Sequence, residues 1–142
     1  MIRIAVVEDE EYYVNQLTGY LNEYQKTEKE ELDITVYRDG DAVTAEYKSQ
    51  FDIILMDIQM KFVDGMTAAE EIRKMDSEVV IIFITNMTQY AIRGYEVDAL
   101  DYVLKPVSYF AFSQKLKRAV SRIKKRSSKY ITLAVKGGVI RV

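Results

Sequence analysis

Short apolar runs alternate regularly with longer amphipathic stretches along most of this sequence. The apolar runs have the length and the β-branched character of buried strands. They predict five strands, at residues Arg3–Val7, Ile34–Tyr37, Ile53–Met56, Val79–Ile84 and Tyr102–Leu104. The stretches that follow them predict five helices, at residues Tyr12–Tyr24, Asp39–Tyr47, Met66–Met75, Thr88–Gly94 and Tyr109–Lys125. Asp39 and Ser108 are the expected N-caps of the second and last helices.

Five strand–helix repeats within about the first 125 residues indicate the fold class. Such an alternation predicts an α/β protein with a doubly wound five-stranded parallel sheet and helices on both faces. Strands that are apolar almost throughout are typical of this arrangement, because both faces of the sheet are covered. The length of 142 residues suits one domain with a core of ordinary size.

The last part of the chain departs from this pattern. Arg126–Lys129 has the composition of a linker, and Tyr130–Val142 predicts two short strands around Gly137–Gly138, which is a hairpin signal. A lone hairpin is marginally stable in water. We therefore expect residues 1–125 to form the main domain, and residues 126–142 to form a linker and the first strands of a second domain that is incomplete here.

Charge is distributed unevenly along the chain. Residues 1–107 hold 10 Lys or Arg and all 22 Asp or Glu, whereas residues 108–142 hold 10 Lys or Arg and no acidic residue. This asymmetry has two interpretations. The basic segment is either a solvated helix face that complements an acidic body, or a surface that binds a partner.

The composition excludes several classes of chemistry, since the chain has no His and no Cys. Disulfides, zinc sites of the usual ligands and His or Cys catalysis are ruled out for it, and any metal must be bound by oxygen. No apolar run approaches the roughly 20 residues of a membrane span, and the first residues do not resemble a signal peptide. We expect a cytoplasmic protein without membrane contact.

Polar side chains of complementary chemistry follow four of the predicted strands. Glu8 and Asp9 follow the first strand and Asp57 follows the third. Thr85 stands at the end of the fourth strand, and Lys105 follows the fifth. In an open parallel sheet the carboxyl ends of the strands meet at one edge, where binding sites form. The sequence therefore predicts a site built from three carboxylates, one hydroxyl and one ammonium.

These groups predict a definite chemistry. Glu8, Asp9 and Asp57 would repel one another unless a cation or a proton intervened, and Mg²⁺ suits a small site of oxygen ligands. An aspartate beside such an ion is an established nucleophile toward phosphoryl groups. Lys105 and Thr85 would then stabilise the oxygens of the transferring phosphoryl group.

Several motifs resemble the receiver domain of two-component response regulators over about residues 1–125. The matching segments are VVEDE (6–10), FDIILMDIQM (51–60), the FIT triplet that ends at Thr85, and DYVLKP (101–106). The resemblance implies a flavodoxin-like fold with strand order 2-1-3-4-5. It also implies Mg²⁺ (or Mn²⁺) as the cofactor, and a protein that catalyses only its own phosphoryl transfer and autodephosphorylation.

The resemblance also assigns roles to individual residues. Glu8 and Asp9 resemble the acidic metal-binding pair, and Asp57 resembles the phosphoacceptor, which is also a metal ligand. The backbone carbonyl of Gln59 resembles the third protein ligand of the metal.

On the phosphate side, Thr85 and Lys105 resemble the contacting hydroxyl and ammonium. Tyr102 resembles the switch aromatic, which changes rotamer when Thr85 engages phosphate. The family also implies a cis peptide bond between Lys105 and Pro106.

A narrower resemblance concerns the last part of this region. Residues 90–119 are similar to receivers of the LytTR (LytR/AlgR) subfamily, and residues 124–142 resemble the basic linker and the start of its DNA-binding domain. This implies a sensor histidine kinase as partner and a homodimer formed on phosphorylation. The expected interface is the Thr88–Gly94 segment with the basic last helix. DNA would be bound only through the full-length C-terminal domain.

Other classes fit less well. A flavodoxin-like cofactor site needs a phosphate-binding loop after the first strand, where Glu8–Glu11 would repel phosphate. A metal-dependent phosphatase or a Toprim-type enzyme would need a DxD motif, but the relevant strands end in EDE and DIQ. A stand-alone or degenerate receiver that acts as a phosphorylation-independent interaction module stays open as the alternative.

Overall fold

The structure, a computed structural model, describes residues 1–86 and 97–136, with side chains described up to Arg126. Five parallel strands form one sheet in the order β2-β1-β3-β4-β5, which confirms the predicted strand order. The strands are β1 (Ile2–Val7), β2 (Leu32–Tyr37), β3 (Ile53–Met56), β4 (Val80–Thr85) and β5 (Asp101–Leu104). All four strand pairs are parallel, so their carboxyl ends lie at one edge of the sheet.

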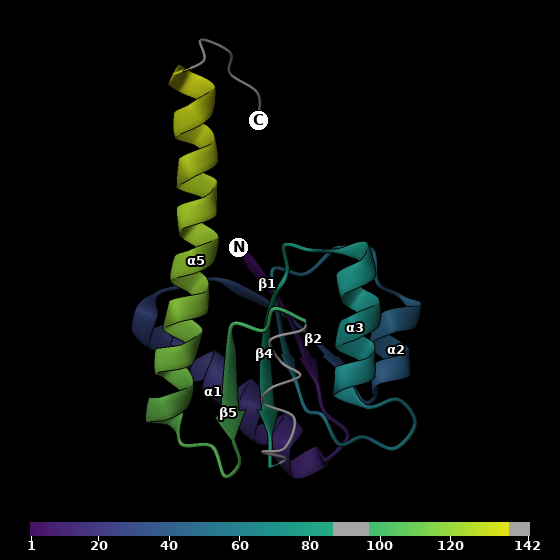
Figure 1. The fold of residues 1–142 in the computed structure, drawn as a ribbon. Helices are drawn as coiled ribbons and strands as arrows, with labels where there is room; N and C mark the ends of the chain where they lie inside the picture. Colours follow the sequence, from purple (N-terminus) through teal and green to yellow (C-terminus); the bar gives the residue numbers. More distant parts are fainter. Residues whose placement is uncertain (87–96, 137–142) are drawn as a thin grey trace.

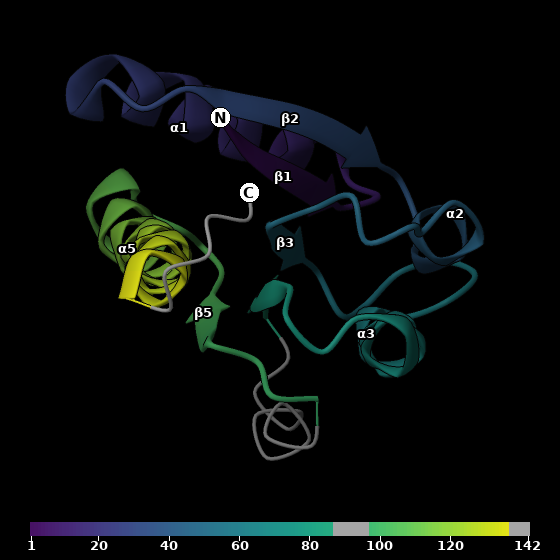
Figure 2. The ribbon, with the colours of Figure 1, turned by 90° about the horizontal axis from the view of Figure 1, so that it is seen from above.

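Helices cover both faces of this sheet, as predicted (Figures 1 and 2). They are α1 (Glu11–Glu28), α2 (Gly40–Ala45), α3 (Gly65–Met75) and α5 (Tyr109–Lys136). Figure 2 shows α1 and α5 on one side of the strands and α2 and α3 on the other. The predicted Thr88–Gly94 helix, which is also part of the expected interface, lies outside the described residues.

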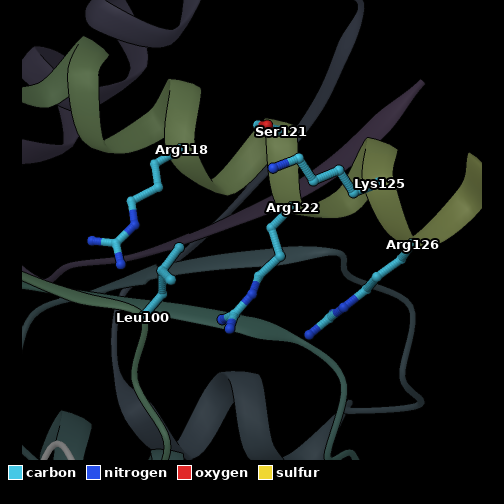
Figure 3. Close-up of a pocket in the computed structure, with 6 residues that line it drawn as sticks. All are labelled: Leu100, Arg118, Ser121, Arg122, Lys125 and Arg126. Atoms are coloured by element: carbon cyan, nitrogen blue, oxygen red, sulfur yellow. The ribbon is translucent and has the colours of Figure 1, made fainter. Parts of the chain in front are cut away.

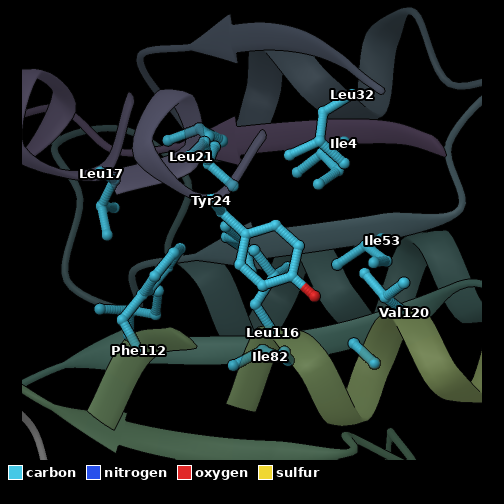
Figure 4. Packing of buried hydrophobic residues seen from close by; sticks show 14 of the residues in the cluster. Ile4, Leu17, Leu21, Tyr24, Leu32, Ile53, Ile82, Phe112, Leu116 and Val120 are labelled. Atoms are coloured by element: carbon cyan, nitrogen blue, oxygen red, sulfur yellow. The ribbon is translucent and has the colours of Figure 1, made fainter. Parts of the chain in front are cut away.

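Each face of the sheet has its own hydrophobic core. Figure 4 shows the core between the sheet and the two helices α1 and α5, where Leu17 and Leu21 of α1 and Phe112 and Leu116 of α5 pack on the same face of the strands. Phe112, Leu116 and Val120, which follow one another at helical spacing along α5, are all buried in this core. The second core packs Val43 of α2 and several apolar side chains of α3 against the other face. Two buried faces explain why the strands are apolar along nearly their whole length.

The helix starts follow the sequence closely. Asp39 caps α2, and its side chain accepts a hydrogen bond from the backbone N–H of Asp41. The hydroxyl oxygen of Ser108 accepts from Ala111 N–H at the start of α5, at 3.2 Å. Both N-cap predictions are confirmed. The helix α1 extends to Glu28, past its predicted end at Tyr24. The prediction stopped short because the last turn is polar and exposed, so the apolar periodicity does not continue through it.

One prediction about the C-terminal segment is wrong. Residues 126–136 are helical and continue α5, where the sequence predicted a linker and a strand from Tyr130. No Gly or Pro interrupts the chain before Gly137 in this stretch, and a helix pairs its own backbone groups, whereas a strand needs a partner. The hairpin signal at Gly137–Gly138 lies outside the described residues, and the division into two domains stays a prediction. None of the described helices combines the length and the apolar character needed to cross a membrane.

Candidate functional site

The predicted acidic residues meet at the carboxyl edge of the sheet. Oxygen atoms of Glu8, Asp9 and Asp57 all lie within 4.8 Å of one another. Glu8 and Asp57 are buried, with 1% and 5% of their surfaces exposed, whereas Asp9 is exposed. Thr85 is fully buried at the end of β4. The strands thus bring together the groups that the sequence placed after them.

Lys105 lies inside this acidic cluster. Its Nζ is 2.5 Å from Oε1 of Glu8 and 3.3 Å from Oδ2 of Asp57, and only 5% of its side chain is exposed. The same ammonium lies over the ring of Tyr13, at 3.9 Å from the ring centroid. The peptide bond between Lys105 and Pro106 is cis, as the resemblance predicted.

Burial and neighbouring charges shift the pKa values of two groups in the cluster. Desolvation raises the pKa of Glu8 to about 7, helped by the charge of Asp57 and opposed by the hydrogen bond from Lys105. Burial alone would lower the pKa of Lys105, but the hydrogen bond to Glu8 and the charges of Asp57 and Glu8 outweigh it and raise that pKa. The lysine is therefore held as a cation between two carboxyl groups.

Backbone contacts fix the position of Asp57. Its N–H donates to the carbonyl of Val7 at 3.0 Å, and its Oδ1 accepts from the N–H of Ile58 at 2.8 Å. The N–H of Gly65 donates to the carbonyl of Ile58 at 2.7 Å, so the start of α3 lies directly against this strand end. Asp57 is held in place before any ligand binds.

Asp39 holds the loop beside the site. Its carboxylate accepts from the N–H groups of Phe62 at 3.0 Å and Val63 at 2.7 Å. Burial would raise the pKa of Asp39, but these backbone hydrogen bonds outweigh it and hold that pKa below its ordinary value. Sequence reasoning identified Asp39 only as a helix cap and missed this second role.

The site opens to solvent through a pocket. Its lining residues are Asp9, Glu10, Tyr13, Asp57, Gln59, Met60, Lys61, Asn86 and Lys105. Gln59 lies in the wall of this pocket, where the resemblance placed a metal ligand; that role stays a prediction. The donor set consists of the oxygen atoms of three carboxyl groups, and two of these groups, Glu8 and Asp57, contact the ammonium of Lys105. Such a set fits a hard divalent cation such as Mg²⁺ or Mn²⁺.

Tyr102 lies on β5, the strand that Lys105 follows. Its ring is partly buried, packs against the core on the α2–α3 face, and lies 6.3 Å from the ring of Phe83 between centroids. Its assignment as the switch residue stays a prediction. Tyr109, at the start of α5, is partly buried and packs against Tyr20, with ring centroids 5.4 Å apart.

Two residues of the site were missed from sequence. Tyr13 lies in the first turn of the helix that begins just after Asp9, which is a signal that it could reach the same edge. Gly65 lies so close to Asp57 that a Cβ atom would come 2.0 Å from the carbonyl oxygen of Asp57. The sequence offered one signal for this close approach: a glycine stands at the first position of α3, directly after the N-cap residue Asp64.

A second cluster lies on α5, away from the acidic site. We call the groove shown in Figure 3 the α5 basic groove; it is lined by Leu100, Arg118, Ser121, Arg122, Lys125 and Arg126. The side chains of Arg118, Arg122 and Arg126 extend from the helix toward the side on which Leu100 lies.

Both interpretations of the basic segment find support in the contacts of α5. Lys117 pairs with Glu28 at 3.0 Å, Lys124 with Glu30 at 2.6 Å, and Arg118 with Asp101 at 3.3 Å, so this helix does complement the acidic body. Among the residues that the structure describes, Arg122 and Lys125 have no ion pair. Part of the groove thus remains available to an anionic partner.

Comparison with protein families gives a match to the response regulator receiver domain over residues 4–117. The chain is similar to the sensory transduction protein LytT of Bacillus anthracis, with 37% identity over 120 residues, which is 83% of this chain and 47% of that protein. It is also similar to the transcriptional regulatory protein LytR of Staphylococcus aureus strain N315, with 31% identity over 129 residues, 90% of this chain and 49% of that protein. The chain spans about half the length of these curated relatives.

Solved structures show the same fold. The response regulatory domain of mrkE from Klebsiella pneumoniae superposes with a TM-score of 0.77 at 25% identity, over 87% of this chain and 99% of that one. The response regulator TrrA from Thermotoga maritima, solved in complex with Mg(2+)-BeF, gives a TM-score of 0.72 at 27% identity. The match covers 84% of this chain and 99% of that one.

Proposed function

Because the chain belongs to the response regulator receiver domain family, with LytT and LytR regulators among its relatives, we propose that it is a phosphorylation switch whose phosphoacceptor is Asp57. The observation that carries this proposal is the buried contact of Lys105 with Glu8 and Asp57, with Asp9 and Thr85 at the same edge. Three carboxyl groups, two of which contact a buried lysine, are arranged for a phosphoryl group and a cation.

In the proposed reaction a carboxylate oxygen of Asp57 attacks phosphorus while the bond from phosphorus to the leaving group breaks. Lys105 donates hydrogen bonds to the non-bridging oxygens as their charge is redistributed, and the hydroxyl of Thr85 donates to another of them. Mg²⁺ or Mn²⁺, bound by Glu8, Asp9, Asp57 and the carbonyl of Gln59, would neutralise negative charge on the carboxylates and the phosphoryl group.

The phosphoryl donor has to be another molecule. The chain has no histidine, so it cannot provide a phosphohistidine itself. We propose that a sensor histidine kinase is the partner and that a small acyl phosphate can replace it in solution. The chemistry of the chain is then limited to its own phosphorylation and dephosphorylation.

The proposed output is a change of surface near β5 and α5. In this proposal Thr85 moves toward the phosphoryl group, Tyr102 takes the space that it leaves, and the surface changes between two states. We propose that the chain then forms a homodimer and controls a C-terminal transcriptional domain, which alone binds DNA. In the α5 basic groove, Arg122 and Lys125 have no ion pair within the described part of the chain and could bind an acidic surface on a second copy.

The deciding experiment is incubation with acetyl phosphate and Mg²⁺, followed by intact mass spectrometry. We expect one addition of about 80 Da, the mass of a phosphoryl group, to the wild-type chain. The addition should be absent with EDTA and with Asp57→Asn. Full modification of Asp57→Asn would overturn the assignment, and no modification of the wild type would favour a phosphorylation-independent interaction module.

Self-association needs a separate test, because it concerns the output and not the site. Size-exclusion chromatography with beryllofluoride should shift the wild-type chain toward a dimer, and it should leave Asp57→Asn unchanged. A wild-type elution volume that does not respond would remove the dimer from the proposal for these residues.

A further inference from the structure

The ammonium of Lys105 is surrounded on three sides. Two sides face the carboxyl oxygens of Glu8 and Asp57, at 2.5 and 3.3 Å. The remaining contact is with the face of the Tyr13 ring, at 3.9 Å from its centroid. An ammonium over an aromatic face is attracted by the ring quadrupole, and the attraction is larger where water is excluded. Only 5% of the lysine side chain is exposed, so the ring replaces solvent here.

The ring is carried by a rigid element. Tyr13 lies in the first turn of α1, and the next residue, Val14, is buried together with Leu17 one turn later. The backbone N–H of Val14 donates to the carbonyl of Glu10 at 3.0 Å, which closes this turn. The packing of Val14 and Leu17 thus fixes the backbone that carries the Tyr13 ring. The ring of Tyr12 touches that of Tyr13 edge-on, with centroids 5.0 Å apart, but Tyr12 is exposed and does not hold this backbone.

The ring also lines the pocket through which a phosphodonor must reach Asp57. Gln59, Met60 and Lys61 contribute to the same lining. When a phosphoryl group enters, Lys105 has to exchange a carboxylate partner for a phosphoryl oxygen. A hydrogen bond is directional, whereas the attraction to a ring face tolerates rotation of the ammonium. Tyr13 can therefore hold the ammonium near Asp57 while its hydrogen-bond partners change.

We infer that Tyr13 is a positioning residue for phosphoryl transfer, acting through the ammonium of Lys105. This inference rests on the proposed phosphorylation of Asp57. In the step concerned, the oxygen of Asp57 forms a bond to phosphorus as the phosphorus–oxygen bond of acetyl phosphate breaks and acetate leaves. No proton or electron has to be supplied. Tyr13 touches none of the reacting atoms; it keeps the cation where the phosphoryl oxygens arrive.

The test compares two substitutions of Tyr13 with one of its neighbour. Tyr13→Phe keeps the ring face and removes the hydroxyl, whereas Tyr13→Leu removes the face. Tyr12→Leu is the matched control, because Tyr12 is an adjacent exposed tyrosine that does not line the pocket. The rate of phosphorylation is measured by intact mass over a series of acetyl phosphate concentrations with Mg²⁺.

We expect Tyr13→Leu to lower the maximal rate about tenfold, in line with one desolvated cation–aromatic contact. The concentration for half-maximal rate should change much less, since the ring does not bind the donor. Tyr13→Phe and Tyr12→Leu should stay within about twofold of wild type. An unchanged rate for Tyr13→Leu, or an equal loss in Tyr13→Phe, would overturn the inference.

A second readout does not depend on phosphorylation. In the metal-free protein the ε-methylene protons of Lys105 should show an upfield NMR shift from the Tyr13 ring, retained in Tyr13→Phe and lost in Tyr13→Leu. If no variant is phosphorylated but this pattern holds, the proposed function fails and the contact stands. If the shift is absent from the wild type, the inference itself fails. Should Tyr13→Leu not fold, Tyr13→Gln is used in both measurements.

Discussion

Gly65 lies directly against the backbone of Asp57, and a Cβ atom at Gly65 would come 2.0 Å from the Asp57 carbonyl oxygen. Backbone atoms cannot yield as a flexible side chain can, so Gly65→Ala has to displace the start of α3 or the end of β3. We expect it to lower the free energy of unfolding by about 1 to 3 kcal/mol. It should also slow phosphorylation of Asp57. Urea denaturation and intact mass spectrometry measure the two effects.

Gly19 provides the control for this substitution. It lies within α1, and a Cβ atom there would meet nothing within 4 Å. Gly19→Ala should therefore raise the free energy of unfolding by about 0.5 to 1 kcal/mol, because alanine is the better helix former. A loss of stability at Gly19 as large as that at Gly65 would show that close packing against Asp57 is not the cause.

A pH prediction follows from the buried carboxyl group of Glu8. Its pKa in the folded protein is about 7, above the ordinary value of 4.5, so the folded state keeps a proton that the unfolded chain has released. The contribution of Glu8 to the free energy of unfolding is therefore fully present below about pH 4.5, and it is lost as the pH rises through about 7. We expect the free energy of unfolding in EDTA to fall by about 1 to 3 kcal/mol between pH 5 and pH 7.

The chain is well suited to this measurement because it has no histidine to titrate in the same range. Asp39 and Asp76 have lowered pKa values, so their contributions are lost only at more acidic pH. Urea denaturation at a series of pH values gives the slope, and Glu8→Gln should flatten it. A metal-free protein that becomes more stable from pH 5 to pH 7 would contradict the assignment.

Metal binding can be separated from folding at Asp9. This carboxylate is exposed in the acidic cluster, whereas Glu8 and Asp57 are buried. Asp9→Asn should leave the melting temperature in EDTA nearly unchanged, since exposed polar substitutions usually alter stability by less than about 0.5 kcal/mol. In the wild type, millimolar Mg²⁺ should raise the melting temperature by relieving carboxylate repulsion. An equal rise in Asp9→Asn would exclude Asp9 as a ligand.

Arg73 anchors the chain that leads into β5. Its guanidinium donates to the carbonyl oxygens of Val97 at 2.6 Å, Asp98 at 3.0 Å and Asp76 at 3.2 Å. A lysine cannot reproduce this planar set of donors, so Arg73→Lys should lower the free energy of unfolding by about 1 to 3 kcal/mol.

The neighbouring Lys74 is the control for Arg73. It pairs with Glu71 at 3.0 Å on the surface, and 71% of its side chain is exposed. Lys74→Ala should change stability by no more than about 1 kcal/mol, because an exposed pair contributes little. Equal effects at the two positions would mean that the carbonyl contacts of Arg73 are not what stabilises this region.

The strands of the sheet and most residues of the site could be predicted from the sequence, because both depend on local patterns. β3 matches its predicted range, since a short run of apolar residues between polar neighbours has little freedom in its boundaries. Glu8, Asp57 and Lys105 could be brought together by topology alone, because parallel strands end at one edge. The order of the strands, by contrast, came from the family resemblance.

What the sequence did not reveal depends on contacts between distant segments. The contact of Tyr13 with Lys105 spans most of the chain, and the approach of Gly65 to Asp57 depends on how α3 begins. The continuation of α5 past Arg126 was missed for another reason. Residues such as Ile131 and Val135 favour strands locally, and whether a strand forms depends on a partner strand.

The length of α5 has a mechanical consequence. Arg126 is bonded to the carbonyl of Glu78, just before β4, and beyond this point the helix runs on past the sheet to Lys136 (Figure 1). That extension acts as a lever arm of about 15 Å, because each helical residue adds about 1.5 Å. A tilt of about 10° at its base would move its tip by about 3 Å. Displacements too small to reorganise the core are thus amplified at the far end of the helix.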